Sequence, residues 1–147
     1  MIIFLDIDGV LHPEPATIEQ AFCRRHLLWE MLSARPRLLL VISSDWREHH
    51  SLPELTGLII SGGDARLSDR FIGTTPVIPG AKNEYRGRER ECLHWLAESG
   101  FTDGQWLAID DVAGNFSYGS PRLVLTDYRV GLTSQDVEHV LLKLPCP

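Results

Sequence analysis

The sequence predicts an α/β protein in which a mainly parallel, five-stranded sheet lies between two layers of helices. Short apolar segments that do not alternate, such as residues 2–6, are typical of strands buried on both faces of a parallel sheet. Helical patterns separate these segments, and such alternation favours right-handed crossovers between parallel strands. The length of 147 residues fits one domain over residues 1–147.

The first half of the chain opens with a strand, a helix and a second strand. The uninterrupted apolar run places the first strand at residues 2–6, in the centre of the sheet. An apolar helical pattern follows over residues 17–34, and Pro36 ends it. The run at residues 38–42 predicts the second strand, and a short helix is expected at residues 46–50.

The middle of the chain is predicted to hold a third strand and a long loop. The sequence Gly-Leu-Ile-Ile at residues 57–60 favours a strand, closed by Ser-Gly-Gly at residues 61–63. Residues 64–85 contain several glycines and prolines and no sustained period, which predicts a surface loop. Because long loops in compact domains are usually functional or mobile, this loop is a candidate wall of the substrate site.

The last third of the chain returns to the alternating pattern. A helix is predicted at residues 89–99, and Gly100 follows it at the position where a left-handed residue commonly ends a helix. Apolar runs predict the fourth strand at residues 106–109 and the fifth at residues 123–125. A final helix is expected from Thr133 or Ser134, either of which could cap it, to about residue 144.

Two aspartates and a glycine follow the first strand. Asp6 and Asp8 lie two residues apart, and Gly9 allows the chain to turn so that both acids can approach one cation. Two carboxylates this close repel each other unless a metal ion or a shared proton holds them. The alternative interpretation is that Asp8-Gly9 forms an ordinary tight turn.

Polar residues also follow two other predicted strands. Ser43 and Ser44 come after the second strand, and Asp110 and Asp111 come after the fourth. In open α/β sheets, ligands bind beyond the carboxyl ends of the strands. We therefore expect Asp6, Ser44 and Asp110 to converge at one edge of the sheet, although they are far apart in sequence.

This ordered set of motifs resembles the haloacid dehalogenase (HAD) superfamily of phosphohydrolases, over nearly the whole chain. The similarity rests on Phe4 to Val10 and on the paired acids after the fourth strand. More narrowly, the sequence is similar to the small domains of Swiss Army knife RNA-repair proteins, through Leu11-His12-Pro13, Ser44-Asp45-Trp46-Arg47 and Trp95-Leu96. The resemblance implies a Rossmann-like, HAD-like fold. Only about residues 12–36 and 61–85 are available for a cap, so we expect no large cap domain.

The resemblance implies a Mg²⁺-dependent phosphatase that acts through an aspartyl-phosphate intermediate. Asp6 is assigned as the nucleophile, and Asp8 as the general acid that protonates the leaving alcohol and then activates water. We expect Mg²⁺ between the Asp6 carboxylate, the Asp8 backbone carbonyl, and Asp110 or Asp111. The second acid favours phosphoester hydrolysis over carbon–halogen cleavage, because an alkoxide leaving group needs a proton and a halide does not.

The phosphate-binding residues are less sharply defined. Ser44 is favoured over Ser43 as the hydroxyl that donates to a phosphoryl oxygen. The basic residue of the superfamily is usually lysine, but Lys82 lies in the predicted loop, so Arg88 or the nearby Arg86 is expected to neutralise the phosphate. The remaining candidate substrate-binding residues are Gly9, Asp45 and His12. His12 could instead be a partly solvated structural residue.

Three functional interpretations follow. The first is a general Mg²⁺-dependent phosphatase, and the second is an RNA or DNA end-processing phosphatase, which should prefer oligonucleotide termini to small phosphate esters. The third is a binding module without catalysis, which the intact pair Asp6 and Asp8 disfavours. A site without a large cap suits large phosphoesters. The net charge of −6 disfavours a general nucleic-acid groove, although Arg86, Arg88 and Arg90 could meet one phosphorylated end.

The location is expected to be cytoplasmic. No apolar run approaches the roughly 20 residues of a membrane span, and Met1 leads directly into the first strand without a secretory signal. Cys23, Cys92 and Cys146 are odd in number and form no CxxC motif, which argues against a disulfide framework and a zinc site. Cys23 and Cys92 are expected to be small core residues in helices.

Overall fold

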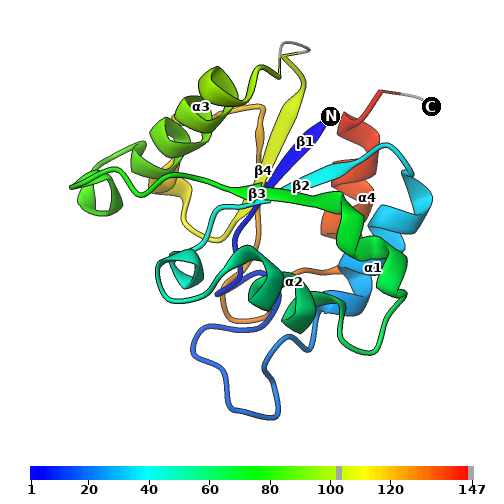
Figure 1. The fold of residues 1–147 in the computed structure, drawn as a ribbon. Coiled ribbons are helices and arrows are strands. Elements are labelled where there is room, and N and C mark those ends of the chain that lie inside the picture. Colours follow the sequence, from blue (N-terminus) through cyan, green and yellow to red (C-terminus); the bar gives the residue numbers. More distant parts are fainter. Residues whose placement is uncertain (102–103, 146–147) are drawn as a thin grey trace.

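Five strands form one sheet in the order β3-β2-β1-β4-β5 (Figure 1). The central strand β1 (Ile2–Leu5) pairs with β2 (Leu39–Ile42) on one side and with β4 (Trp106–Asp110) on the other. The edge strands are β3 (Phe71–Thr74) and β5 (Leu123–Leu125). All four pairings are parallel, which confirms the predicted fold class.

Helices cover both faces of the sheet in this computed structural model, which describes residues 1–101 and 104–145. Helix α3 (Gly87–Ser99) lies on one face. On the other face lie the helices α1 (Arg25–Ala34), α2 (Leu52–Ile60) and α4 (Ser134–Lys143). Residues 12–36 and 61–85, the segments long enough for a cap, are occupied by turns, short 3₁₀ turns, α1 and β3, so no large cap domain is present among the described residues. None of the described helices has the length and apolar character needed to cross a membrane.

The alternation of side chains along β1 explains its uninterrupted apolar sequence. Ile3 and Leu5 belong to the core cluster that includes α1, α2 and α4, whereas Ile2 and Phe4 belong to the cluster under α3. All four side chains are buried. A strand buried on both faces must be apolar at every position, and its central place in the sheet carries the chain to the middle of the carboxyl edge.

The predicted third strand is wrong. Residues 57–60 form the end of α2, and the third strand of the sheet is β3, inside the predicted loop of residues 64–85. Helix α2 begins with a capping box, in which the Ser51 hydroxyl accepts from the Glu54 N–H while the Glu54 carboxylate accepts from the Ser51 N–H. This cap favours a helix from residue 52. The apolar run 57–60 then forms its last turn, in which Ile59 is buried and Leu58 is exposed.

The helix predicted over residues 17–34 is also too long. Thr17 and Gln20 do exchange the hydrogen bonds of a capping box, but residues 18–24 form turns, and α1 begins only at Arg25. Phe22 has a left-handed backbone, with φ of 57°, which interrupts a right-handed helix. Cys23 is consequently exposed, against expectation, while Cys92 is buried as expected and Cys146 lies outside the described residues.

Smaller differences concern short elements. The helix predicted at residues 46–50 is a 3₁₀ turn over Asp45–Glu48. The predicted loop of residues 64–85 contains, besides β3, the 3₁₀ turns Ala65–Arg70 and Ala81–Asn83. The final helix matches expectation, because the Thr133 side chain caps the N-terminus of α4.

Candidate active site

Three carboxylates meet at the carboxyl edge of the sheet. Asp6 follows β1, Asp110 ends β4, and Asp111 is the next residue. One oxygen from each of the three lies within 4.8 Å of the others. The Asp6 N–H donates to the Ile109 carbonyl at 3.1 Å, so the ladder between β1 and β4 fixes the backbone beside this group. We call these three residues the acidic cluster.

The acidic cluster is electrostatically unfavourable when all of its members are ionised. Burial raises the pKa of Asp6 well above its usual value, and the charge of Asp110 adds to this shift. Burial likewise raises the pKa of Asp110 to about 6 and raises that of Asp111. Such shifts from burial and neighbouring charge are common at functional sites. A bound cation would relieve the repulsion.

The donor set fits Mg²⁺. The cluster offers only carboxylate oxygens, which are the ligands that this ion prefers. Gly9 has φ of +72°, and a Cβ atom there would lie 2.3 Å from Asp111 Oδ2, so the glycine allows the first turn after β1 to approach the cluster closely. Asn115, which the sequence did not single out, donates to Asp110 Oδ1 at 3.2 Å and orients that carboxylate. Asp6, Asp110 and Asp111 would hold the ion.

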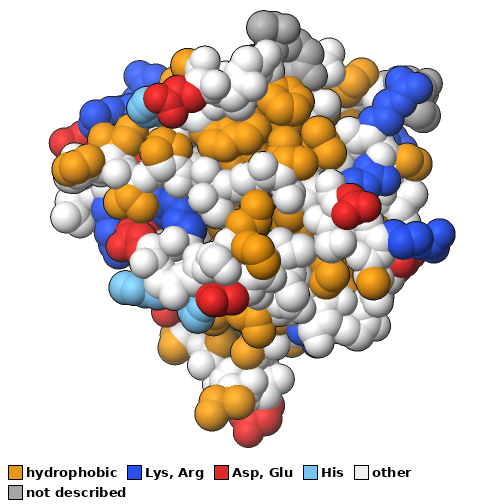
Figure 2. Space-filling view, viewed as in Figure 1, with side chains coloured by type: hydrophobic (Ala, Val, Ile, Leu, Met, Phe, Trp, Pro, Cys, Tyr) orange, Lys and Arg blue, Asp and Glu red, His pale blue; other side chains and the backbone are white. Residues whose placement is uncertain are grey.

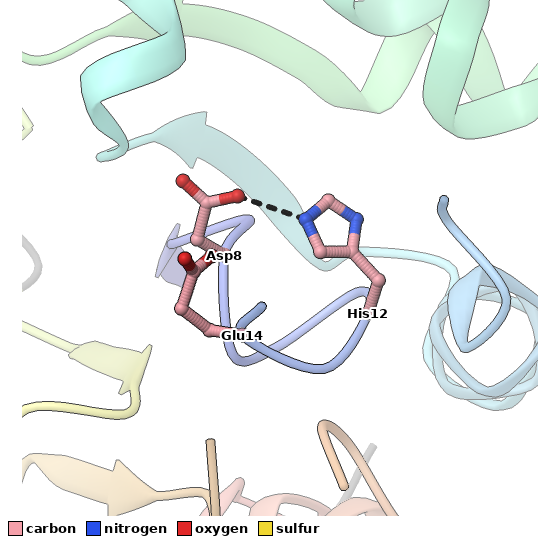
Figure 3. A group of neighbouring side chains, drawn as sticks. All are labelled: Asp8, His12 and Glu14. Carbon is pink, nitrogen blue, oxygen red and sulfur yellow. Dashed lines mark hydrogen bonds and ion pairs between the residues drawn. The ribbon is translucent and has the colours of Figure 1, made fainter. Parts of the chain in front are cut away.

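The Asp8 side chain lies outside the acidic cluster. Its Oδ1 accepts a hydrogen bond from His12 Nε2 at 2.8 Å (Figure 3). The same oxygen accepts a second hydrogen bond from Trp46 Nε1 at 3.0 Å. The bond from His12 is the main reason that the pKa of Asp8 is lowered. His12 is 3% exposed, so the expectation of a partly solvated histidine is wrong. Of the four predicted metal ligands, only Asp8 has a side-chain carboxylate that does not join the acidic cluster. The backbone carbonyl of Asp8 remains a predicted ligand.

Asp8, His12 and Glu14 form a second group in which potential ligand atoms lie within 4.8 Å of one another. Figure 3 shows His12 pointing at Asp8, with Glu14 further along the same loop. The Phe22 N–H donates to His12 Nδ1 at 3.2 Å, which leaves the ring proton on Nε2. Both ring nitrogens are therefore engaged, and we assign no metal to this group.

The two candidate serines point to different neighbours. Ser44 is fully buried, and its hydroxyl oxygen accepts from the Trp46 N–H at 3.4 Å, so the Ser44 proton is left to donate elsewhere. Ser43 Oγ lies 3.6 Å from the sulfur of Cys92, on the α3 face of the sheet. This geometry agrees with the preference for Ser44 as the phosphate ligand, which remains a prediction.

The two candidate arginines differ in burial and in partners. The Arg88 side chain is only 10% exposed. It donates to Asp45 Oδ1 at 2.8 Å and to Glu91 Oε2 at 2.9 Å. It also lies close enough to Asp6 for the two charges to interact. Burial opposes its charge, but the bond to Asp45 and the charge of Asp6 outweigh burial and raise the pKa of Arg88. Arg86 is half exposed, directly precedes α3 and pairs with Glu89 in the first turn of that helix. Arg88 is thus the arginine that faces the acidic cluster.

Two further cations belong to this network. Arg47, with a side chain 2% exposed, donates to Glu91 Oε2 at 2.7 Å and to the carbonyls of Ser44, Thr75 and Pro76. Lys82, which lies in the predicted loop of residues 64–85, has its Nζ atom 2.6 Å from Asp45 Oδ2. Asp45 therefore binds two cations, which makes it a positioning group for Arg88 rather than a group free to accept from substrate.

Replacing Asp110 with asparagine should raise the melting temperature of the metal-free protein, because it removes one of three clustered negative charges. In EDTA, the stability of the wild type should increase as the pH falls from about 7 to about 5, since the raised pKa of Asp110 lets the folded state take up a proton before the unfolded state. Asp110→Asn should weaken this dependence.

Thermal melts of both proteins with EDTA and with Mg²⁺ would check the prediction. A ligand that binds the native state stabilises it, so Mg²⁺ should raise the melting temperature of the wild type. It should raise that of the variant only a little. A variant that is less stable in EDTA and still stabilised by Mg²⁺ would contradict the assignment of Asp110 to the ion site.

Comparison with known proteins places the chain in a family. No curated protein and no solved structure matches it. A family model, described as the HAD domain in Swiss Army Knife RNA repair proteins, matches residues 2–137 of the 147. This range contains the acidic cluster, Asp8 and the arginine network, and the five-stranded parallel sheet agrees with the fold that the family implies. The chain therefore belongs to the family of HAD domains in Swiss Army Knife RNA repair proteins.

Proposed function

We propose that the protein is a Mg²⁺-dependent phosphomonoesterase that acts through an aspartyl-phosphate on Asp6. The observation that carries this proposal is the acidic cluster, whose carboxylates lie within 4.8 Å of one another beside the buried Arg88. A cluster of acids alone would repel a phosphate dianion. The same acids with a divalent cation and an arginine form a site in which a carboxylate can approach phosphorus.

The residues divide the reaction into two steps. A carboxylate oxygen of Asp6 attacks phosphorus while the bond to the leaving oxygen breaks, and Asp8 gives its proton to that oxygen. Asp8 then takes a proton from water, which attacks the phosphoryl group, releases inorganic phosphate and restores Asp6. Bound Mg²⁺ would neutralise charge on the phosphoryl group and on the acidic cluster.

Arg88 and Ser44 would hold the phosphoryl oxygens during both steps. The guanidinium is fixed by Asp45 and Glu91, so it presents its remaining N–H groups in a defined direction. The lowered pKa of Asp8 favours the ionised form, which a general base needs. A bound phosphate dianion raises the pKa of a nearby carboxyl group, so substrate binding itself favours the protonated form that the first step requires.

A phosphorylated RNA or DNA end is the second candidate substrate. The family description names RNA repair proteins, and no separate cap covers the carboxyl edge among the described residues. In the space-filling view, the basic side chains on the visible face lie among acidic ones and form no continuous basic surface (Figure 2). Together with the net charge of −6, this arrangement supports contact with one terminus rather than with a long backbone.

Phosphate release from p-nitrophenyl phosphate and from 3′- and 5′-phosphorylated oligonucleotides tests both proposals. We expect release with Mg²⁺ and none with EDTA. A higher kcat/KM for an oligonucleotide end would select the second candidate, and comparable values would select a general phosphatase. If a folded protein that is stabilised by Mg²⁺ releases phosphate from none of them, the proposal is wrong for these ester classes and the binding-module interpretation gains support.

A further inference from the structure

The two oxygens of the Asp8 carboxylate have different surroundings. Both N–H donors, His12 Nε2 and Trp46 Nε1, bind Oδ1, and no described residue donates a hydrogen bond to Oδ2. The Asp8 side chain is 42% exposed, whereas His12 is almost fully buried behind it. The carboxylate is therefore anchored through one oxygen on its protein side, and the other oxygen remains accessible.

The His12 ring is fixed in the tautomer that this anchoring needs. A backbone N–H can only donate, so the contact from Phe22 N at 3.2 Å makes Nδ1 the acceptor and places the ring proton on Nε2, which faces Asp8. Phe22 makes this contact from a left-handed backbone, a conformation that bulky residues rarely adopt. The surrounding structure therefore holds the Phe22 backbone in an uncommon conformation that directs its N–H at His12.

The rings themselves are packed against one another. The Phe22 ring contacts His12 and Trp46 edge-on, with centroids 5.4 Å and 5.3 Å away, and His50 stacks on Trp46 at 5.3 Å. The Trp46 backbone N–H is also bound by the Ser44 hydroxyl. Neither donor can turn away from Asp8 without disturbing this aromatic group, so the direction of the Asp8 carboxylate is set before substrate binds.

We propose that His12 and Trp46 are positioning residues that hold Oδ1 of Asp8 and so reserve Oδ2 for proton transfer. Oδ1 already accepts hydrogen bonds from two N–H groups, so it has little capacity left to bind a proton of its own. When Asp8 is protonated, its acidic proton therefore sits on Oδ2. That proton passes from Oδ2 to the leaving oxygen as the phosphorus–oxygen bond breaks. In the second step Oδ2 takes the proton from the attacking water.

This inference rests on the proposed phosphatase activity, and the dependence of the reaction on its leaving group tests it. A leaving alkoxide must receive a proton, whereas 2,4-dinitrophenolate departs without one. The kcat/KM value reports the steps up to departure of the leaving group, so the later hydrolysis of the aspartyl-phosphate does not affect the comparison. We would measure kcat/KM for an alkyl phosphate and for 2,4-dinitrophenyl phosphate in each variant.

The informative variants are Trp46→Phe, His12→Asn and His12→Gln. Trp46→Phe keeps an aromatic ring but removes the N–H, and the short amide of asparagine does not reach Asp8. The longer amide of glutamine can place an N–H where Nε2 lies, so it should rescue the function. The matched controls are Trp29→Phe, which loses an indole bond to the Ile59 carbonyl in the core, and His94→Gln, whose partner Glu98 is also four residues away but on the surface.

We expect Trp46→Phe and His12→Asn to lose about 10-fold or more in kcat/KM for the alkyl phosphate, within the roughly 10²- to 10⁴-fold range of general acid catalysis. The loss for 2,4-dinitrophenyl phosphate should be several times smaller. His12→Gln should recover most of the alkyl-phosphate activity that His12→Asn loses, and the controls Trp29→Phe and His94→Gln should stay near the wild type for both esters. Equal losses for both esters in a variant that still melts cooperatively would overturn the proposal, because they would indicate a structural role alone.

A second measurement separates this inference from the proposed activity. The ¹⁵N chemical shifts of the His12 ring report which nitrogen carries the proton, and they need no substrate. We expect a proton on Nε2 and an indole proton of Trp46 that exchanges slowly with water. An Nδ1 proton on His12 would overturn the positioning role even in an active enzyme. A wild type that releases no phosphate from any ester would overturn it too, together with the phosphatase proposal, whatever the tautomer.

Discussion

Replacing Asp6 with asparagine should lower phosphate release by about 10⁴-fold or more, the scale expected when a covalent nucleophile is removed. Asparagine has nearly the same shape and keeps the hydrogen bond that the Ile7 N–H donates to Asp6 Oδ1 at 2.8 Å. It cannot form the acyl phosphate, and it offers the ion a neutral amide oxygen in place of a charged one. The measurement is phosphate release with Mg²⁺, with the purified variant at high concentration so that a small residual rate can be detected.

Stability and a surface control make the result specific. Asp6→Asn removes one charge from the acidic cluster, so in EDTA the variant should melt at a temperature at least as high as that of the wild type. Asp64→Asn, at an exposed aspartate paired with Arg66, should leave activity unchanged. Substantial phosphate release from Asp6→Asn, with the same metal dependence as the wild type, would assign the nucleophile to another group and end the aspartyl-phosphate proposal.

Replacing Arg47 with alanine should destabilise the protein by about 3–5 kcal/mol, as expected when one partner of a buried ion pair is removed. The Arg47 side chain is almost fully buried, and its loss leaves Glu91 with one fewer cation and three backbone carbonyls without their donor. Carbonyls of this kind are costly to bury without partners. Urea denaturation, followed by circular dichroism, would measure the free energy of unfolding.

Two comparisons sharpen this prediction. Arg66→Ala removes an arginine that also pairs with a carboxylate, but its side chain is 89% exposed, and the change in the free energy of unfolding should be close to zero. Arg47→Lys keeps the charge but cannot reach several acceptors at once, so it should lie between the wild type and Arg47→Ala. If Arg47→Ala unfolds at the same urea concentration as the wild type, the network around Glu91 does not support the fold as the contacts imply.

The acidic cluster could be predicted because two general rules act together on it. β1 and β4 are short apolar runs, and parallel strands bring their carboxyl ends to one edge of the sheet. The paired acids at the end of β4 and the acid after β1 must therefore be neighbours. These inferences needed neither the correct third strand nor the correct first helix, because β1, β2 and β4 form the centre of the sheet.

The edge of the sheet could not be assigned as reliably. β3 has the sequence Phe-Ile-Gly-Thr, so its apolar run is only two residues long, and only Phe71 is buried. Gly73 gives Trp95 room to approach, since a Cβ atom there would lie 3.0 Å from the indole nitrogen. The apolar residues of α2 made a stronger strand pattern than β3 itself. The capping box at Ser51 and Glu54 was the signal that could have corrected this assignment.

The partners of the site residues were the least predictable part. Trp46 reaches Asp8 across 38 positions of sequence, and Arg47 reaches Glu91 across 44. Such contacts depend on how the 3₁₀ turn after β2 packs against its neighbours, which no local pattern encodes. No sequence pattern relates Lys82 to Asp45, although the two side chains form an ion pair. Arg88, in the first turn of α3, binds the same carboxylate, and this contact is likewise not encoded locally.

Glu91 links the fold and the site, because one of its carboxylate oxygens binds both Arg47 and Arg88 while the other accepts from the Ile78 N–H. Arg47 supports the fold, and Arg88 faces the acidic cluster. Suppose that a descendant of this chain acquired a substrate of different charge. It could not simply exchange Arg88, because the exchange would remove one of the two cations that bind the buried Glu91, which Arg47 also binds in the interior. Such a descendant would need paired substitutions, one at Arg88 and one that compensates at its partner. Helix α3, which carries both Arg88 and Glu91, therefore limits how the sequence of the domain can diverge.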